Sequence, residues 1–185
     1  MVSKYKYGKR IWAMPHEEFT KQLDKGRYVR AEHKTLIMFL YWSALRIMEA
    51  LELRRAQFKV LETMLIVDVG QREKHSKTTP PLEFPRSLPF IDDIVRHLYR
   101  VRTGRRVWAY SRSTGYRIVK RVFKKEYPHF FRLNRITNLL ATPGITIADV
   151  RTFTGLTVAS IESYAGFVTA KRIGELHKKS TEVTN

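Results

Sequence analysis

The chain has 185 residues, 43% of them hydrophobic, which is enough for one globular domain with a sizeable core. Its 35 lysines and arginines against 17 aspartates and glutamates give a formal net charge of +18. That charge favours a polyanion as partner, with nucleic acid as the first candidate and an anionic membrane surface as the second. The absence of cysteine excludes disulfides and thiolate metal sites.

The two ends of the chain and its longest apolar run bear on domain organisation and location. Residues 1–13 are basic and aromatic without periodicity, and we interpret them as an N-terminal arm or linker remnant ahead of a single domain, residues 14–185. They contain no apolar run of the kind a signal peptide needs. The run from Leu36 to Leu45 is about half of the ~20 residues that span a membrane. We therefore expect a cytoplasmic protein without a membrane partner.

Helices are predicted at the start of the domain. One begins at His16, after Pro15, and ends near Gly26. Residues 31–45 form the most apolar helix, which is predicted to be central. Leu36, Phe39, Leu40 and Ser43 fall on one stripe of this helix, with Ile37, Tyr41 and Ala44 beside it.

Arg46 follows the apolar helix directly, and the helical pattern continues to residue 53. An arginine between two apolar helices needs a partner, because a lone buried charge is costly. Glu49 lies three residues on, within reach on the same helical face. A simple arginine–glutamate pair on the surface is the alternative interpretation.

Two extended runs follow, residues 58–69 and residues 78–84. Two consecutive prolines confine the second run to the edge of a sheet or to an irregular strand. Lys74 and Lys77 lie in the basic hairpin tip between the runs, where they can reach a ligand. Ordinary solvated turn lysines would give the same pattern.

The next two predicted helices are residues 88–102 and a helix that begins after Ser111 or Ser113 and runs to about Tyr127. The second helix has a basic face, interleaved with aromatic residues, that is typical of contact with a DNA backbone. A merely solvated basic face is the competing interpretation. The basic residues are Arg117, Lys120, Arg121, Lys124 and Lys125.

The last third of the chain carries the residues that point to chemistry. His129 and Arg132 sit three apart on a helix that begins at Pro128, so they share a face. A short helix from residue 147 to Gly155 comes next, and then a capped segment that presents Tyr164. Two arginines from distant segments and a late tyrosine suit chemistry on a phosphodiester, since guanidinium groups bind phosphate through paired, charge-assisted hydrogen bonds.

The order of these features resembles the catalytic domain of the tyrosine recombinase (phage-type integrase) family over about residues 14–179. The stretch SALRIMEALELR resembles the first arginine box, HFFRLNRITNLL the second box, GQREKHSKTTPPLEF the hairpin with the catalytic lysine, and TGLTVASIESY the segment that ends at the nucleophile. The resemblance implies an α+β fold, mostly α, with a small antiparallel sheet. It implies the following site, with Lys74 preferred to Lys77 and Glu49 in support: Arg46, Lys74, His129, Arg132 and the nucleophile Tyr164.

The chain departs from the family pattern at three points. Leu156 stands where the family usually has histidine or tryptophan, which removes one phosphate or general-acid contact. The spacing from Gly155 to Tyr164 is one residue shorter than usual, and Leu133 replaces a common histidine. The family also places a helical core-binding domain ahead of the catalytic one, and we expect that domain to be absent here.

The resemblance implies a site-specific DNA recombinase or integrase that cleaves and rejoins DNA through a 3′-phosphotyrosyl intermediate, in the service of a viral, plasmid or other mobile element. It implies double-stranded DNA as partner, self-association as a tetramer in synapsis, and neither metal nor cofactor. The alternatives are a nicking and closing enzyme like the type IB topoisomerases, a non-catalytic DNA-binding relative, and a basic RNA-binding protein.

Overall fold

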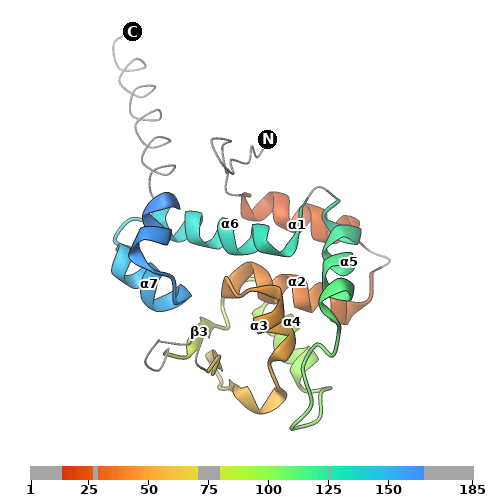
Figure 1. Ribbon diagram of the computed structural model, residues 1–185. Coiled ribbons are helices and arrows are strands. Elements are labelled where there is room, and N and C mark those ends of the chain that lie inside the picture. Colours follow the sequence, from red (N-terminus) through yellow and green to blue (C-terminus); the bar gives the residue numbers. More distant parts are fainter. Residues whose placement is uncertain (1–13, 27–28, 71–79, 125, 165–185) are drawn as a thin grey trace.

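The computed structural model describes residues 14–26, 29–70, 80–124 and 126–164 (Figure 1). The fold is α+β and mostly α, as expected, with one small antiparallel sheet. Its elements are α1 (His16–Lys25), α2 (Ala31–Ser43), α3 (Ile47–Glu52), the 3-10 turn η1 (Arg55–Gln57), β1 (Phe58–Val60), β2 (Met64–Val67), β3 (Leu82–Pro85), α4 (Ile91–Leu98), α5 (Arg112–Val122), α6 (Pro128–Ala141) and α7 (Ile147–Thr154).

Helix α2 is the centre of the molecule, as its composition predicts. Every residue from Thr35 to Ser43 is buried, and the helix packs on both α6 and α4. Phe19 of α1 stacks on Tyr41, and Phe39 packs against Trp108, with ring centroids 4.0 and 4.9 Å apart. A helix buried on all sides is typical of a core element, and the surrounding helices pack on α2.

The turn between α2 and α3 sets the direction of Arg46. Ala44 adopts the left-handed conformation, with φ of 54°, and so ends α2 two residues before the expected boundary. Helix α3 then packs tightly on α5, where a Cβ built on Gly115 would lie 3.0 Å from Ile47 Cδ1. Glycine at this contact allows the close approach that fixes α3, and Arg46 stands at the beginning of α3.

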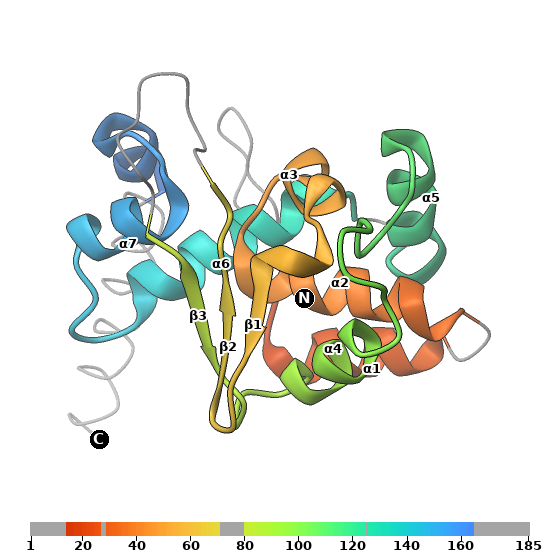
Figure 2. The same cartoon turned by 90° about the horizontal axis from the view of Figure 1, so that it is seen from below.

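The sheet corrects one sequence expectation, because residues 58–69 form a hairpin rather than a single strand. β1 and β2 pair antiparallel, with Phe58 opposite Val67, and the Leu61 amide donates to the Met64 carbonyl at 2.8 Å to close the turn. β3 pairs with the other side of β2 and ends at Pro85, so it is an edge strand as expected (Figure 2). Alternate side chains of the three strands are buried toward the core.

Two helices are shorter than predicted. α4 begins only at Ile91, since Phe90 before it has φ of 70°, and it ends at Leu98. α5 is capped by Ser111, whose hydroxyl accepts from the Thr114 amide, and it ends at Val122 instead of continuing to about residue 127. Proline at 128 disfavours helical backbone just before it, which separates α5 from α6.

The C-terminal part of the described chain packs on α6 through a small apolar cluster of its own. Thr146 and Asp149 form a capping box at the start of α7, and Gly155 ends the helix with φ of 66°. A further helical segment, residues 158–164, ends at Tyr164. Across the ranges that the structure describes, no helix has the length and apolar character to cross a bilayer.

Candidate active site

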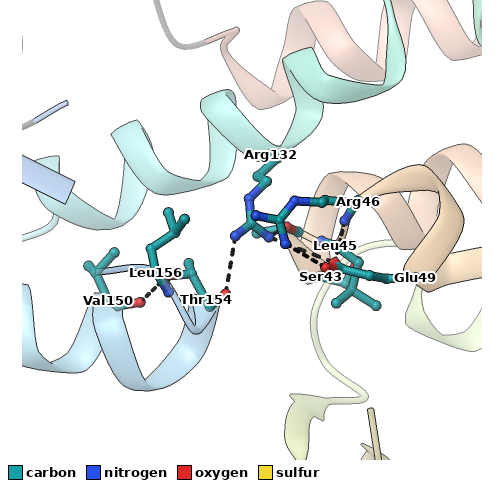
Figure 3. Close-up of polar contacts among 9 residues, drawn as sticks. Ser43, Leu45, Arg46, Glu49, Arg132, Val150, Thr154 and Leu156 are labelled. Atoms are coloured by element: carbon teal, nitrogen blue, oxygen red, sulfur yellow. Dashed lines mark hydrogen bonds and ion pairs between the residues drawn. The ribbon is translucent and has the colours of Figure 1, made fainter. Parts of the chain in front are cut away.

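Arg46 and Glu49 form a compact pair at the beginning of α3. The Glu49 carboxylate accepts from the Arg46 backbone amide at 2.6 Å and from Arg46 Nη1 at 2.7 Å (Figure 3). The contact caps the helix and orients the guanidinium at the same time. Arg46 remains 50% exposed, so the expectation that this arginine would be buried is wrong. α2 has already ended at Ser43, and Arg46 stands at the N-terminal end of α3 with its side chain toward solvent.

Arg132 is the buried arginine of the pair, with a side chain only 3% exposed. Its Nη1 donates to the Ala44 carbonyl at 2.6 Å and its Nη2 to the Thr154 carbonyl at 3.2 Å (Figure 3). These two acceptors lie 88 and 22 residues away in the sequence. The guanidinium therefore joins α6 to the end of α2 and to the end of α7.

Glu49 also links the two arginines. Its Oε2 lies 3.9 Å from Arg132 Nη1, while its Oε1 holds Arg46. One carboxylate between two guanidinium groups offsets the repulsion of two like charges at close range. The structure thus brings Arg46, Glu49 and Arg132 together from two distant segments, as the sequence predicts.

Tyr164 lies within electrostatic reach of both arginines. Burial raises the pKa of the Tyr164 phenol above its usual value, and Arg132 and then Arg46 act in the opposite direction. The net direction is upward, because burial outweighs the effect of the two positive charges. The phenol therefore stays protonated over a wider pH range than that of a free tyrosine.

Leu156 gives its position a purely apolar character. Its side chain packs in the cluster formed by Ile136, Val150 and Ile161, which Tyr164 also contacts. Its backbone amide donates to Thr154 Oγ1 at 3.3 Å (Figure 3). A leucine offers no side-chain donor to a phosphate, so this position adds none to those of the two arginines.

Some of the remaining predicted residues lie within the described ranges, and others lie outside them. His129 lies in the first turn of α6 and is exposed, while Arg132, one turn further, is buried. Four of the five predicted DNA-binding residues, Arg117, Lys120, Arg121 and Lys124, are exposed on α5 and just beyond it. Lys74, Lys77 and Lys125 lie outside the described residues. Within the described ranges, no cluster of histidine and acidic side chains could hold a metal ion.

Sequence reasoning missed the acceptors that hold Arg132. Both are backbone carbonyls, and the one at Ala44 depends on a left-handed turn at a residue that is not glycine. Such a conformation is uncommon for alanine, so the residue type gives no signal of it.

Comparison with solved structures relates this fold to a known class. The chain is similar to the XerH site-specific recombinase bound to palindromic difH substrate in a post-cleavage complex, with a TM-score of 0.69 and 16% identity over 89% of this chain and 52% of that one. It is similar to XerA recombinase, with a TM-score of 0.61 and 14% identity over 84% of this chain and 60% of that one. It also resembles the Tn1549 transposon integrase in complex with transposon right-end DNA, with a TM-score of 0.51 and 16% identity over 88% and 66% of the two chains.

These similarities define the fold as that of a tyrosine recombinase catalytic domain. The chain spans about half the length of the XerH structure and 60% of the XerA structure. No protein-family model and no curated protein sequence matches the chain.

Proposed function

We propose that residues 14–185 are the catalytic domain of an enzyme that breaks and rejoins DNA strands through a phosphotyrosyl intermediate. One observation carries the proposal: Glu49 lies close to both Arg46 and Arg132, and Tyr164 is near enough to both arginines for their charges to lower its pKa against the effect of burial. A fold shared with recombinases adds support, because a residue set and a scaffold that agree are less often coincidental than either alone.

The two arginines would bind the non-bridging oxygens of one phosphate. Guanidinium groups donate in pairs to phosphate oxygens and carry a permanent charge, so they stabilise the extra negative charge of a pentacoordinate transition state. Arg132 is held by two carbonyls and Arg46 by one carboxylate, so neither group has to reorganise when charge develops. Such preorganised donors are the main electrostatic contribution in many enzymes.

Tyr164 would attack the phosphorus atom. Its oxygen forms the new bond to phosphorus, the bond from phosphorus to the 5′ oxygen breaks, and the 3′ end stays attached to the protein. The phenolic proton passes to a base, for which His129 is our candidate, and Lys74, or else Lys77, gives a proton to the departing 5′ oxygen. Attack by a 5′-hydroxyl reverses these steps and reseals the strand without an external energy source.

The exposed basic face of α5 would hold the DNA backbone. Arg117, Lys120 and Arg121 are exposed on α5 and Lys124 is exposed just beyond it, in a chain with a net charge of +18. Neutralising phosphates in this way makes binding steeply dependent on salt. Double-stranded DNA as partner, a tetramer in synapsis, action on DNA inside the host cell, and service to a viral, plasmid or other mobile element are the finer parts of the proposal.

A trapping experiment tests the function without knowledge of the target sequence. The full chain is incubated with a pool of duplexes of random sequence, each nicked so that cleavage releases a short fragment and prevents resealing. Adducts that survive denaturant are isolated, and their DNA is sequenced to give a single duplex for later work. We expect adducts with the wild-type chain and none with Tyr164→Phe.

Tyr99→Phe is the matched control for this experiment, because Tyr99 is an exposed tyrosine at the end of α4. It should form adducts as the wild type does. A wild-type chain that binds the duplexes and forms no adduct under any salt condition would contradict the proposal and favour a DNA-binding protein without catalysis.

A further inference from the structure

Arg135 occupies an unusual place one turn after Arg132 on α6. Its guanidinium carbon lies 4.8 Å from the centre of the Trp42 ring and 5.7 Å from the centre of the Phe153 ring. Its Nε is buried without a hydrogen-bond partner, and burial lowers the pKa of the group. Among the residues that the structure describes, no carboxylate forms an ion pair with it. Two aromatic rings therefore lie against a largely desolvated cation, and the Tyr41 phenol acts on its pKa in the direction opposite to burial.

The two rings belong to the same segments that hold Arg132. Trp42 stands two residues before Ala44, and Phe153 stands directly before Thr154. The carbonyls of Ala44 and Thr154 both accept hydrogen bonds from the Arg132 guanidinium. Arg135 thus contacts, through side chains, the same ends of α2 and α7 that Arg132 contacts through the backbone.

Trp42 is fixed independently of Arg135. Its indole nitrogen donates to the Pro89 carbonyl at 2.8 Å, so the ring is tied to the segment that precedes α4. Arg135 therefore contacts a ring on the α2 side that is already held in place, and its second contact holds Phe153 of α7 near that ring. Each cation–π contact is worth about 0.5–2 kcal/mol, depending on desolvation.

An apolar side chain would fill this space at lower cost. Removing a guanidinium from water without a carboxylate partner is unfavourable, and a leucine or methionine on α6 would pack against both rings without that penalty. The arginine gains directional contacts to two planar rings at once, which a flexible apolar side chain does not provide. Arg135 therefore contributes more to the relative placement of the two rings than to the stability of the fold.

We infer that Arg135 is a positioning residue for Arg132. By contacting Trp42 and Phe153 it sets the separation between the ends of α2 and α7, and this separation fixes the two carbonyls that aim the Arg132 guanidinium at a phosphate. The inference rests on the proposed function, in which Arg132 binds the scissile phosphate. Displacing a phosphate-binding group by about 1 Å can slow a reaction roughly 100-fold, so the contact would be felt in the rate.

The test is a double-mutant cycle on single-turnover adduct formation, with the full chain in excess over the duplex recovered from the random pool. The proteins are the wild type, Arg135→Met, Arg132→Lys and the double variant, with the DNA dissociation constant and the melting temperature measured for each. We expect Arg135→Met to slow adduct formation roughly 10- to 100-fold. Its DNA affinity should stay within about threefold of the wild type and its melting temperature within ~4 °C.

Arg96→Met is the matched control. Arg96 is an exposed arginine on α4 that pairs with Asp93, so the variant removes the same charge away from the site. It should leave the single-turnover rate unchanged. If Arg135→Met does not fold, Phe153→Leu takes its place in the same cycle, because it removes one ring and keeps the arginine.

The pattern of rates decides the inference. If Arg135 acts through Arg132, the double variant is no slower than Arg132→Lys alone, because there is no longer a well-aimed guanidinium to lose. Independent, multiplicative effects, or an Arg135→Met rate equal to the wild type, overturn the inference and leave the proposed function standing. A wild-type chain that forms no adduct at all overturns the proposed function first, and the inference with it.

Discussion

The two apolar clusters of the molecule differ in size and in what they hold. The larger unites side chains from α1 to the first half of α6, including Phe130 and Phe131. The smaller has three fully buried members, Ile136, Val150 and Ile161, and Tyr164 packs on it. Arg132 stands on α6 between the two. The arginines thus lie against an extensive core, whereas Tyr164 packs on a small cluster, which we expect to open more readily than the large one.

This difference suits the chemistry proposed for the site. A phosphate-binding pair must keep its geometry while charge develops, and a large core gives that rigidity. A tyrosine that attacks DNA must leave a partly buried position, and a small cluster lets it do so at low cost. The clusters divide these two requirements between separate parts of the chain.

The largest expected effect comes from the larger cluster. Phe131→Ala removes a fully buried ring that contacts Phe19 and Phe123 edge-on. We expect it to lower the free energy of unfolding by about 3–5 kcal/mol. Urea denaturation followed by circular dichroism measures this, with the exposed Tyr99→Ala as a control that should change little. A loss below about 1 kcal/mol would contradict the difference between the clusters, since the large core would then be no more sensitive to substitution than the surface.

Substitution of the two arginines should have different effects on stability. Arg132→Ala leaves the Ala44 and Thr154 carbonyls without their buried donor, and we expect a loss of about 1–3 kcal/mol in unfolding free energy. Arg46→Ala removes an exposed ion pair and should cost less than about 1 kcal/mol. Both should abolish adduct formation. Equal losses of unfolding free energy in the two variants, measured by urea denaturation, would mean that the buried contacts of Arg132 do not stabilise the fold more than the exposed pair of Arg46 does.

Ile161→Val and Ile94→Val form a matched pair, one in each cluster, because both isoleucines are fully buried. Each should cost about 0.5–1.5 kcal/mol. Amide hydrogen exchange should show the Ile161→Val effect confined to residues 146–164, while Ile94→Val should lower protection across the larger core. Protection lost everywhere in both variants would show that the two clusters open as one unit.

The smallest effect is a dependence on alkaline pH. The folded-state pKa of Tyr164 is raised by burial, so the stability it contributes is complete below the unfolded value of about 10 and is lost as pH rises through the folded value. Tyr164→Phe has no phenol to ionise. Its melting temperature should therefore rise relative to that of the wild type between about pH 9 and pH 11, a range that brackets the unfolded tyrosine pKa of ~10. A difference that stays constant over that range would contradict the assigned direction.

Local chemistry explains which elements the sequence predicts well. α1 and α7 have their expected boundaries, because proline or a capping threonine begins each helix and glycine follows its end. The hairpin of β1 and β2 was missed, since residues 61–63 contain no glycine, proline or asparagine to mark the turn. The turn is instead set by burial of Leu65 and Val67 on one face of the sheet.

The candidate site was predictable where its contacts are local or its residue types are distinctive. Arg46 and Glu49 are three residues apart, and their pairing follows from helical spacing. The surroundings of Arg132 could not be predicted, because they consist of carbonyls from the ends of two other helices. Arg135 was missed for the same reason, since its partners are rings on α2 and α7 that only the assembled fold brings to it.

Mass spectrometry of the trapped adduct identifies the nucleophile directly. After nuclease and trypsin digestion of the adduct formed on the recovered duplex, we expect a nucleotide remnant on the peptide that contains Tyr164 and on no other. Attachment at a different residue, or trapping that persists in Tyr164→Phe, would contradict this expectation.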